Sequence, residues 1–199
     1  ILVMSDHGFG NFKRQFHLNS WLRDNGYLGP ADARSLMNSS SGTPVDWKQT
    51  KAYALWLNGL YINLRGSERE CIVTQRDRAA LMQEISDKLL AVRDPVNGKP
   101  VVKEVYRADK VYAGPWANPL ASPDGSPPAT PDLIVGYYRG YRASWATTLG
   151  DIPEEVIEDN DSAWSADHCV AADEVPGVIF SNKPILRDSP SLIDMAPTI

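Results

Sequence analysis

The spacing of apolar and polar residues along the chain predicts strands and helices in alternation. Residues 1–4 are an apolar run with no polar face, which is typical of a strand covered on both sides in a parallel sheet. A short helix is expected next, ending near Asn25-Gly26, where a left-handed C-cap is natural. Strand-like runs at 52–57 and 60–64 flank Asn58-Gly59 and predict a β-hairpin, because Asn and Gly both tolerate positive φ.

After this hairpin the apolar residues take up a helical period. Leu81, Ile85, Leu89 and Val92 recur at helical spacing, so residues 75–92 are predicted to form an amphipathic helix, with Thr74 or Gln75 near its start. Strands are then expected at 101–106 and 132–137. Together these elements are interpreted as an α/β chain.

Two segments without a clear period are expected to be loops. Residues 29–46 are rich in Gly, Pro, Ser and Asn, and residues 114–131 are rich in proline. Proline cannot serve in a central strand ladder. The proline-rich loop is either a lid over a site or a solvated insertion, and the insertion is the simpler interpretation because loops tolerate extra length.

The composition is that of one folded domain. The chain has 199 residues, of which 43% are hydrophobic and 23% charged, and this is enough for a substantial core. A net charge of −5 and a pI of about 5.2 argue against a general surface for nucleic acid or anionic membranes. No stretch approaches the roughly 18 apolar residues of a membrane span. The compartment and the oligomeric state stay open, with the cytoplasm slightly favoured.

The adjacent residues Asp6 and His7 are the first candidates for chemistry. They follow the apolar run directly, and the carboxyl end of a strand is where open α/β sheets bind ligands. Carboxylate oxygen and imidazole nitrogen both bind zinc, manganese or iron, and Gly8 and Gly10 permit a sharp turn beside an ion. The plain alternative is a helix-capping Asp next to a solvated His.

The other two histidines and the two cysteines have different contexts. His168 precedes an apolar segment at 175–180 and is a second candidate ligand. His17 is expected to be a surface or partly buried helix residue, because no metal-ligand residue accompanies it at helical spacing. Cys71 and Cys169 fit neither a zinc ribbon nor a disulfide framework, so free thiols are expected, although Cys169 adjoins His168.

Several short stretches follow one another in a distinctive order. They include Ser5-Asp6-His7-Gly8-Phe9 and Trp164-Ser165-Ala166-Asp167-His168, with the stretches 19–28, 58–64, 131–137, 140–145 and 175–178. In this order they resemble the type I phosphodiesterase and nucleotide pyrophosphatase branch of the alkaline phosphatase superfamily. The resemblance spans nearly the whole chain.

The resemblance implies a fold and an activity. The fold would be alkaline-phosphatase-like, a mixed, mainly parallel sheet flanked by helices, with residues 1–199 as the C-terminal part of a single catalytic domain. The activity would be hydrolysis of phosphodiester or nucleotide pyrophosphate bonds in a phosphate-ester or nucleotide substrate. Two divalent metal ions are implied, zinc with manganese as the alternative: Asp6 and His7 match ligands of one ion, and His168 matches a ligand of the other. The nucleophile and the remaining ligands are expected upstream, so this chain alone is expected to be inactive.

Two arginines are candidates for substrate binding. Arg139 and Arg142 follow the strand at 132–137 on a predicted loop, where arginines bind phosphate oxygens bidentately. The alternative is an ion pair with the acidic segment 151–161. Two other functions also stay open: a non-catalytic binding or regulatory module, and a sulfatase-like or phosphoglycerate-mutase-like member of the superfamily.

Overall fold

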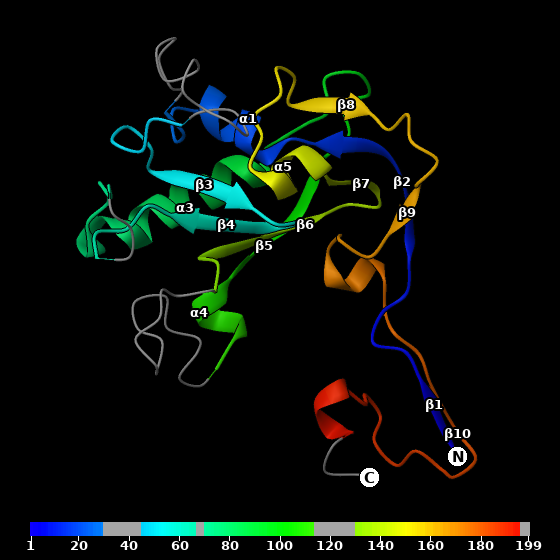
Figure 1. Cartoon of the computed structure of the whole chain (residues 1–199). Coiled ribbons are helices and arrows are strands. Elements are labelled where there is room, and N and C mark those ends of the chain that lie inside the picture. Colours follow the sequence, from blue (N-terminus) through cyan, green and yellow to red (C-terminus); the bar gives the residue numbers. More distant parts are fainter. Residues whose placement is uncertain (30–44, 67–69, 114–129, 196–199) are drawn as a thin grey trace.

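The computed structural model describes residues 1–29, 45–66, 70–113 and 130–195, which form an α/β fold. Two four-stranded sheets make the body, and a two-stranded ribbon extends away from it (Figure 1). Within these residues the strands pair in parallel in one place only, between β2 (Gly10–Phe16) and β7 (Gly140–Ala143). The predicted α/β class is therefore confirmed, while the sheets are only partly parallel.

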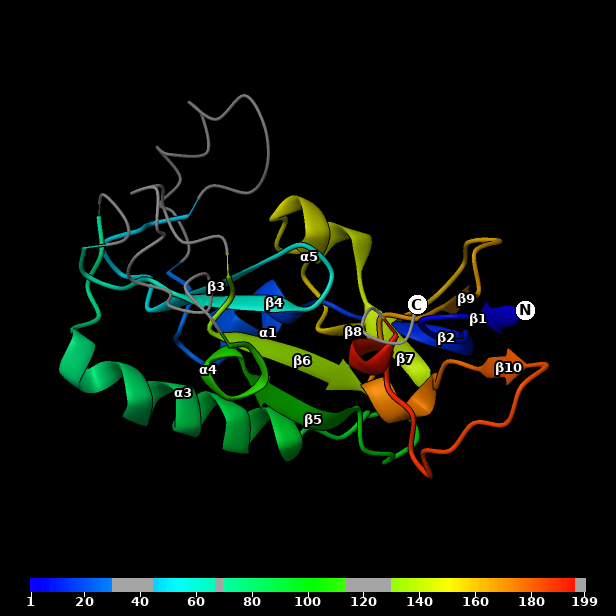
Figure 2. The same ribbon diagram turned by 90° about the horizontal axis from the view of Figure 1, so that it is seen from below.

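The sheet with the strand order β3-β4-β6-β5 is antiparallel. Its strands contain more residues than those of the other four-stranded sheet, so we call it the larger sheet. Its strands are β3 (Ala52–Leu55), β4 (Gly59–Ile62), β5 (Val102–Arg107) and β6 (Leu133–Tyr137). The helix α3 (Gln75–Leu90) runs along this sheet, as seen in Figure 2, and the short α4 (Ala108–Val111) follows β5. The side chain of Thr74 accepts a hydrogen bond from the Asp77 N–H at the start of α3, as predicted. The predicted strands at 101–106 and 132–137 are confirmed, and so is the pairing of the two runs around residue 58 as a hairpin.

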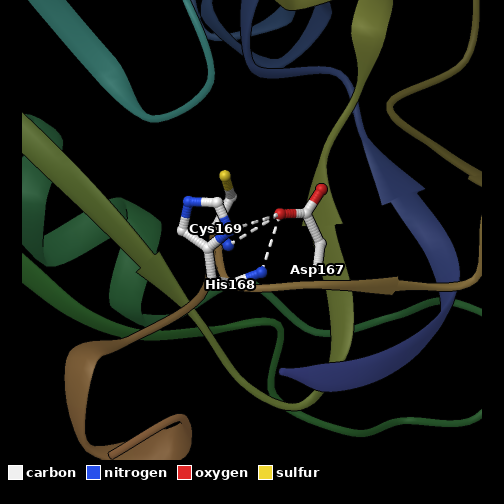
Figure 3. Close-up of side chains that lie close together, drawn as sticks. All are labelled: Asp167, His168 and Cys169. Atoms are coloured by element: carbon white, nitrogen blue, oxygen red, sulfur yellow. Dashed lines mark hydrogen bonds and ion pairs between the residues drawn. The ribbon is translucent and has the colours of Figure 1, made fainter. Parts of the chain in front are cut away.

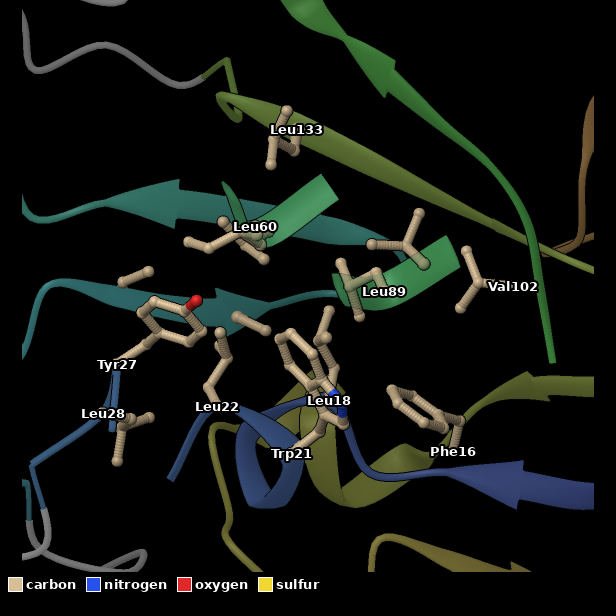
Figure 4. Close-up of a cluster of buried hydrophobic side chains, with 14 of the residues drawn as sticks. Phe16, Leu18, Trp21, Leu22, Tyr27, Leu28, Leu60, Leu89, Val102 and Leu133 are labelled. Carbon is tan, nitrogen blue, oxygen red and sulfur yellow. The ribbon is translucent and has the colours of Figure 1, made fainter. Parts of the chain in front are cut away.

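The hydrophobic core lies between α3, the larger sheet and the helix α1 (Leu18–Asp24), as Figure 4 shows. Met82, Ile85 and Leu89 bury one stripe of α3 because they recur every three or four residues. Leu18 and Leu22 do the same for α1. Helix α1 ends at Asn25-Gly26 as predicted, with Gly26 at φ 73°.

The smaller sheet has β2 at its centre, between β7 and β8 (Ile157–Asp159), with β9 (Ala166–Asp167) pairing further along β2. Strand β2 was not predicted, although Phe12 and Phe16 are buried and the residues beside them are more exposed. Arg142 lies in β7, and Trp145 begins the helix α5 (Trp145–Leu149). The prediction that Arg142 lies on a loop was therefore wrong.

The ribbon consists of β1 (Leu2–Met4) and β10 (Ile179–Ser181), paired antiparallel. The predicted strand exists, but the prediction that it is buried in a parallel sheet was wrong. Ile1 is 89% and Val3 56% exposed, because β10 is the only described strand that pairs with β1 and a ribbon of two short strands has no layer to cover it. The 3-10 helices η2 (Ala172–Glu174) and η3 (Leu192–Asp194) flank β10 in sequence.

The β3–β4 hairpin turns differently from the Asn-Gly prediction. Leu55 pairs with Gly59, so three residues form the loop, and the positive φ of 61° falls on Trp56. Asn58 is held against β6, because its carbonyl accepts from the Val135 N–H at 2.9 Å. This contact fixes the second half of the turn, and the left-handed residue lies at its start instead.

Three sequence expectations remain. The loops expected at 29–46 and 114–131 lie almost entirely outside the described residues, and so does the choice between lid and insertion. Both cysteines are free thiols, as predicted. A search of the described helices found none with the length and apolar character needed to cross a membrane.

Candidate metal centre

Asp6 and His7 lie where the chain leaves the ribbon. His7 forms an isolated β-bridge with Pro176, and the Gly8 N–H donates to the Val175 carbonyl at 3.0 Å. The His7 Nδ1–H donates to the Gly8 carbonyl at 2.9 Å, which leaves Nε2 with a free lone pair. Asp6 Oδ2 lies 3.7 Å from this Nε2.

A close approach of two backbones holds this turn in place. A Cβ atom added to Gly177 would lie 2.8 Å from the Asp6 carbonyl oxygen and closer still to that of Ser5. Only glycine permits the 175–178 segment to pass so near the residue before His7. The ribbon and this contact together bring a segment from late in the sequence against the Asp6-His7 pair.

His168 is brought to the same place. Its ring stacks on the ring of His7, with centroids 4.0 Å apart and planes 9° apart. Phe9 contacts both rings edge-on, at centroid distances of 5.6 Å to His7 and 5.8 Å to His168. The structure therefore gathers all three predicted metal ligands at one exposed surface, from two segments far apart in the chain.

Asp167 is the polar centre of the segment that carries His168 (Figure 3). Its Oδ1 accepts from the backbone N–H groups of His168 at 2.7 Å and Cys169 at 3.1 Å, and lies 3.4 Å from His168 Nδ1. Burial alone would raise the pKa of Asp167, but the Cys169 thiol, the Arg142 charge and these N–H groups hold it below its usual value. Burial is also the main reason why the pKa of the Cys169 thiol is raised to about 12.

Residues 1–151 match the type I phosphodiesterase / nucleotide pyrophosphatase family. The chain belongs to this family. No curated protein and no solved structure matches the chain. The matched region of this phosphodiesterase family member includes Asp6, His7 and both candidate arginines, while His168 lies beyond it. A phosphoester hydrolase is therefore the general class of the protein.

The two candidate arginines occupy different surroundings in this family member. The Arg139 side chain is 57% exposed; its Nη2 donates to the Glu174 carbonyl, and its Nε lies 3.8 Å from the Glu174 carboxylate. It also passes within 3.6 Å of the Cβ position at Gly10, which pairs with Asp167. Arg139 thus lies next to the pairing of Gly10 with Asp167, with its side chain more than half exposed and its guanidinium bonded to Glu174.

Arg142 is buried instead, with 1% of the residue exposed. Its Nη2 lies 3.2 Å from Asp167 Oδ2, and its guanidinium carbon lies over the rings of Trp145 at 4.6 Å and Phe12 at 5.1 Å. The acidic segment 151–161 pairs elsewhere, through Arg14 with Asp159 and His17 with Glu158. Arg139 and Arg142 do form ion pairs, but with Glu174 and Asp167, so the alternative prediction of an ion pair with the segment 151–161 was wrong.

The geometry of Asp6 and His7 fits a metal ion. Zinc bonds of about 2.1 Å and a tetrahedral angle place two ligand atoms about 3.4 Å apart. Asp6 Oδ2 and His7 Nε2 are 3.7 Å apart, so a small adjustment of exposed side chains would let both bind one ion. The described residues also bring Asp167, His168 and Cys169 within 4.8 Å of one another, a second grouping of ligand-type atoms.

Sequence reasoning missed the roles of two residues. The resemblance indicated Asp167 only as a member of the 164–168 stretch, yet the adjacent Asp-His pair at 167–168 repeats the Asp6-His7 pattern and was the available signal. His17 was predicted to be a surface or partly buried helix residue, but it is 2% exposed and lies just before α1. Its Nδ1 is 2.8 Å from Ser144 Oγ and its Nε2 is 3.0 Å from Glu158 Oε1. No local pattern indicates this, because both partners are distant in sequence.

Proposed function

We propose that the protein hydrolyses phosphodiester or nucleotide pyrophosphate bonds with two divalent metal ions, zinc or alternatively manganese. Asp6 and His7 hold one ion and His168 helps to hold the other. The observation that carries the proposal is the stacking of His7 on His168, with ring centroids 4.0 Å apart, from segments far apart in the sequence. Exposed imidazoles brought together beside a carboxylate are suited to metal binding.

The stacking supports separate ions for the two histidines. A ring nitrogen binds a metal through a lone pair in the plane of its ring. The planes of His7 and His168 are 9° apart, so their lone pairs run side by side and do not converge on one point. Asp6 and His7, in contrast, lie at the separation expected of two ligands on one ion.

The chain's own residues would bind and orient the substrate. Bound metal ions would activate the attacking oxygen and neutralise charge on the phosphoryl oxygens. Arg139 takes the substrate-binding role, because its side chain is more than half exposed and its guanidinium, which now pairs with Glu174, would exchange that partner for phosphate oxygens. The substrate-binding role considered for Arg142 has less support, since its guanidinium is buried against Asp167.

We assign the nucleophile to none of the described residues, and the proposed activity is that of the full-length natural protein. The family match supports phosphoester chemistry over the sulfatase-like and phosphoglycerate-mutase-like alternatives. The extent of the catalytic domain, with residues 1–199 as its C-terminal part, remains a prediction. A non-catalytic module is the second candidate, and the absence of turnover in the experiment below would favour it.

The first prediction concerns metal binding and turnover. Titration of the chain with zinc or manganese is expected to show two sites. His7→Ala is expected to weaken one and His168→Ala the other, each by at least tenfold, because each variant loses a direct ligand. His17→Gln is the matched control, since the buried His17 ring contacts Ser144 and Glu158 rather than a candidate ligand, and its replacement should leave both affinities unchanged.

Hydrolysis of bis(4-nitrophenyl) phosphate by the full-length protein completes the test. Turnover that needs added metal and falls in both His7→Ala and His168→Ala is the expected result. Unchanged metal affinity in both variants would contradict the ligand assignment. Metal binding without turnover in the full-length protein would contradict the proposed hydrolysis and leave a metal-binding module.

A further inference from the structure

Arg142 is the most deeply buried charged side chain near the candidate centre. Only 1% of the residue is exposed, and Trp145 and Phe12 cover its guanidinium. Its Nε and Nη2 atoms have no hydrogen-bond partner, so the Asp167 carboxylate, 3.2 Å from Nη2, is the charge that compensates it. A buried arginine enclosed in this way cannot reach a substrate, but it can hold a carboxylate in place.

Asp167, held by Arg142, contacts both the backbone and the ring of His168. Its Oδ1 accepts from the backbone N–H of His168 at 2.7 Å and lies 3.4 Å from Nδ1 of the same residue. An ionised carboxylate has no proton to give, so this contact favours the tautomer with hydrogen on Nδ1. Nε2 then carries the free lone pair. Metal-binding histidines commonly have such a carboxylate on their second nitrogen.

The same residues could be regarded as a metal site in their own right, made of Asp167, His168 and Cys169. The contacts of the carboxylate argue against this. Oδ1 already accepts two backbone N–H groups, while Oδ2 faces the Arg142 guanidinium at 3.2 Å and the Trp164 Nε1–H at 3.4 Å. Neither oxygen is turned toward open space, and a cation there would be repelled by the guanidinium.

We propose that Asp167 and Arg142 are positioning residues for His168. Arg142 anchors and neutralises the Asp167 carboxylate, and Asp167 fixes the backbone and the tautomer of His168 so that Nε2 is presented to the ion. The proposal rests on the proposed function for the identity of His168 as a ligand. The arrangement of the carboxylate around the imidazole does not depend on that function, and it can be measured without metal.

The test compares four variants of the chain. Asp167→Asn removes the charge of the carboxylate and leaves its shape. Arg142→Gln/Asp167→Asn removes both buried charges together, so that neither is left unpaired if the single variant fails to fold. Asp173→Asn is the matched control, because Asp173 lies in the same segment but pairs with Lys103. Cys169→Ala tests the alternative in which the three residues bind an ion directly.

Two readouts are needed. The nitrogen-15 chemical shifts of the His168 ring in the metal-free chain report its tautomer, with His168→Ala used for assignment. Zinc titration then reports affinity. In Asp167→Asn and in the double variant the Nδ1–H tautomer is expected to lose its dominance, and the affinity of the His168 site to fall about 10- to 100-fold. Asp173→Asn and Cys169→Ala are expected to match the unmodified chain.

Other results would contradict either the positioning role of Asp167 and Arg142 or the metal-dependent function. A His168 tautomer and zinc affinity that are unchanged in the folded double variant would overturn the proposal. So would a loss of affinity in Cys169→Ala as large as that in Asp167→Asn, because the cluster would then bind the ion directly. If the unmodified chain binds no metal but its tautomer responds to Asp167→Asn, the metal-dependent function fails while the positioning role stands.

Discussion

The larger sheet with α3 and the ribbon with the candidate centre differ in how far their apolar side chains are buried. Leu60, Ile85, Leu89 and Leu133 in the first region have no exposed surface. In the second region Ile1, Val3, Phe9 and Phe180 are each more than half exposed. The first region buries apolar area without any candidate metal ligand, whereas the second carries every candidate ligand and has little packing of its own.

This difference indicates that one part of the chain supplies most of the folding stability and another part supplies the candidate metal ligands. Full burial of a large apolar side chain stabilises the folded state by about 1.5–3 kcal/mol. The larger sheet and α3 bury many such side chains. The candidate centre depends instead on backbone contacts, such as the close approach at Gly177, and on a few polar side chains, such as Asp167. Substitutions should therefore affect the two regions separately, and three experiments test this.

The largest effect is expected for Leu60→Ala in β4. The side chain is fully buried at the centre of the core, so its truncation should lower the free energy of unfolding by about 2–5 kcal/mol. Urea denaturation followed by circular dichroism measures this. Leu186→Ala, at a residue that is 94% exposed, is the control and should change stability by less than about 0.5 kcal/mol.

Two outcomes would contradict the division between the core and the candidate centre. If folded Leu60→Ala protein also loses zinc affinity, the core and the centre are coupled and the division is wrong. If His7→Ala destabilises the fold as strongly as Leu60→Ala, the exposed centre contributes stability that its burial does not indicate.

A moderate effect is expected for Gly177→Ala. The new Cβ would collide with backbone atoms of Ser5 and Asp6, so the Asp6-His7 turn must move. We expect a loss of about 1–3 kcal/mol from overpacking and at least a tenfold loss of zinc affinity at the Asp6-His7 site. Gly10→Ala is the control, because its Cβ would have ordinary contacts, the nearest at 3.5 Å. Equal affinities in the two variants would contradict the close approach.

The smallest effect is expected from His17, which connects the smaller sheet to α5. Burial lowers the pKa of His17 below 6.5, and this outweighs the opposing effect of Glu158. The unfolded chain therefore binds the proton more readily. The stability linked to His17 is fully present above pH 6.5 and declines as pH falls from there toward the folded pKa.

Urea titrations between pH 7.5 and 5 of the unmodified chain and of His17→Gln measure this linkage. The unmodified chain should lose more stability across the acid range, because the variant has no imidazole to protonate. Parallel pH profiles would show that His17 is not held neutral by burial.

Much of the larger sheet was predictable from the sequence because its signals are local. Helix α3 has an apolar stripe and a Thr74 cap. Asn58-Gly59 between two strand-like runs indicates a hairpin, although the loop that forms is residues 56–58 and Gly59 belongs to β4. The smaller sheet was harder to predict. Strand β2 carries Lys13, Arg14 and Gln15, and its burial depends on β7 and β8, which lie far away in the sequence.

The candidate centre was predictable in its residues but not in its arrangement. Asp6, His7 and His168 were identified through short motifs that resemble the family. The stacking of the two rings and the buried Arg142–Asp167 pair depend on long-range contacts that no local pattern encodes. Whether these residues bind metal stays a prediction.

The pairing of β1 with β10 has a consequence for the order of events during synthesis. The ribosome adds roughly 5–20 residues per second, so about 8 to 30 s separate the appearance of Asp6 from that of His168. During this interval the Asp6-His7 turn has no partner, because the segment that stacks on it has not been made. The stack of His7 on His168 therefore cannot form before residue 168 has been synthesised, whereas α1, α3 and the β3–β4 hairpin are complete well before it.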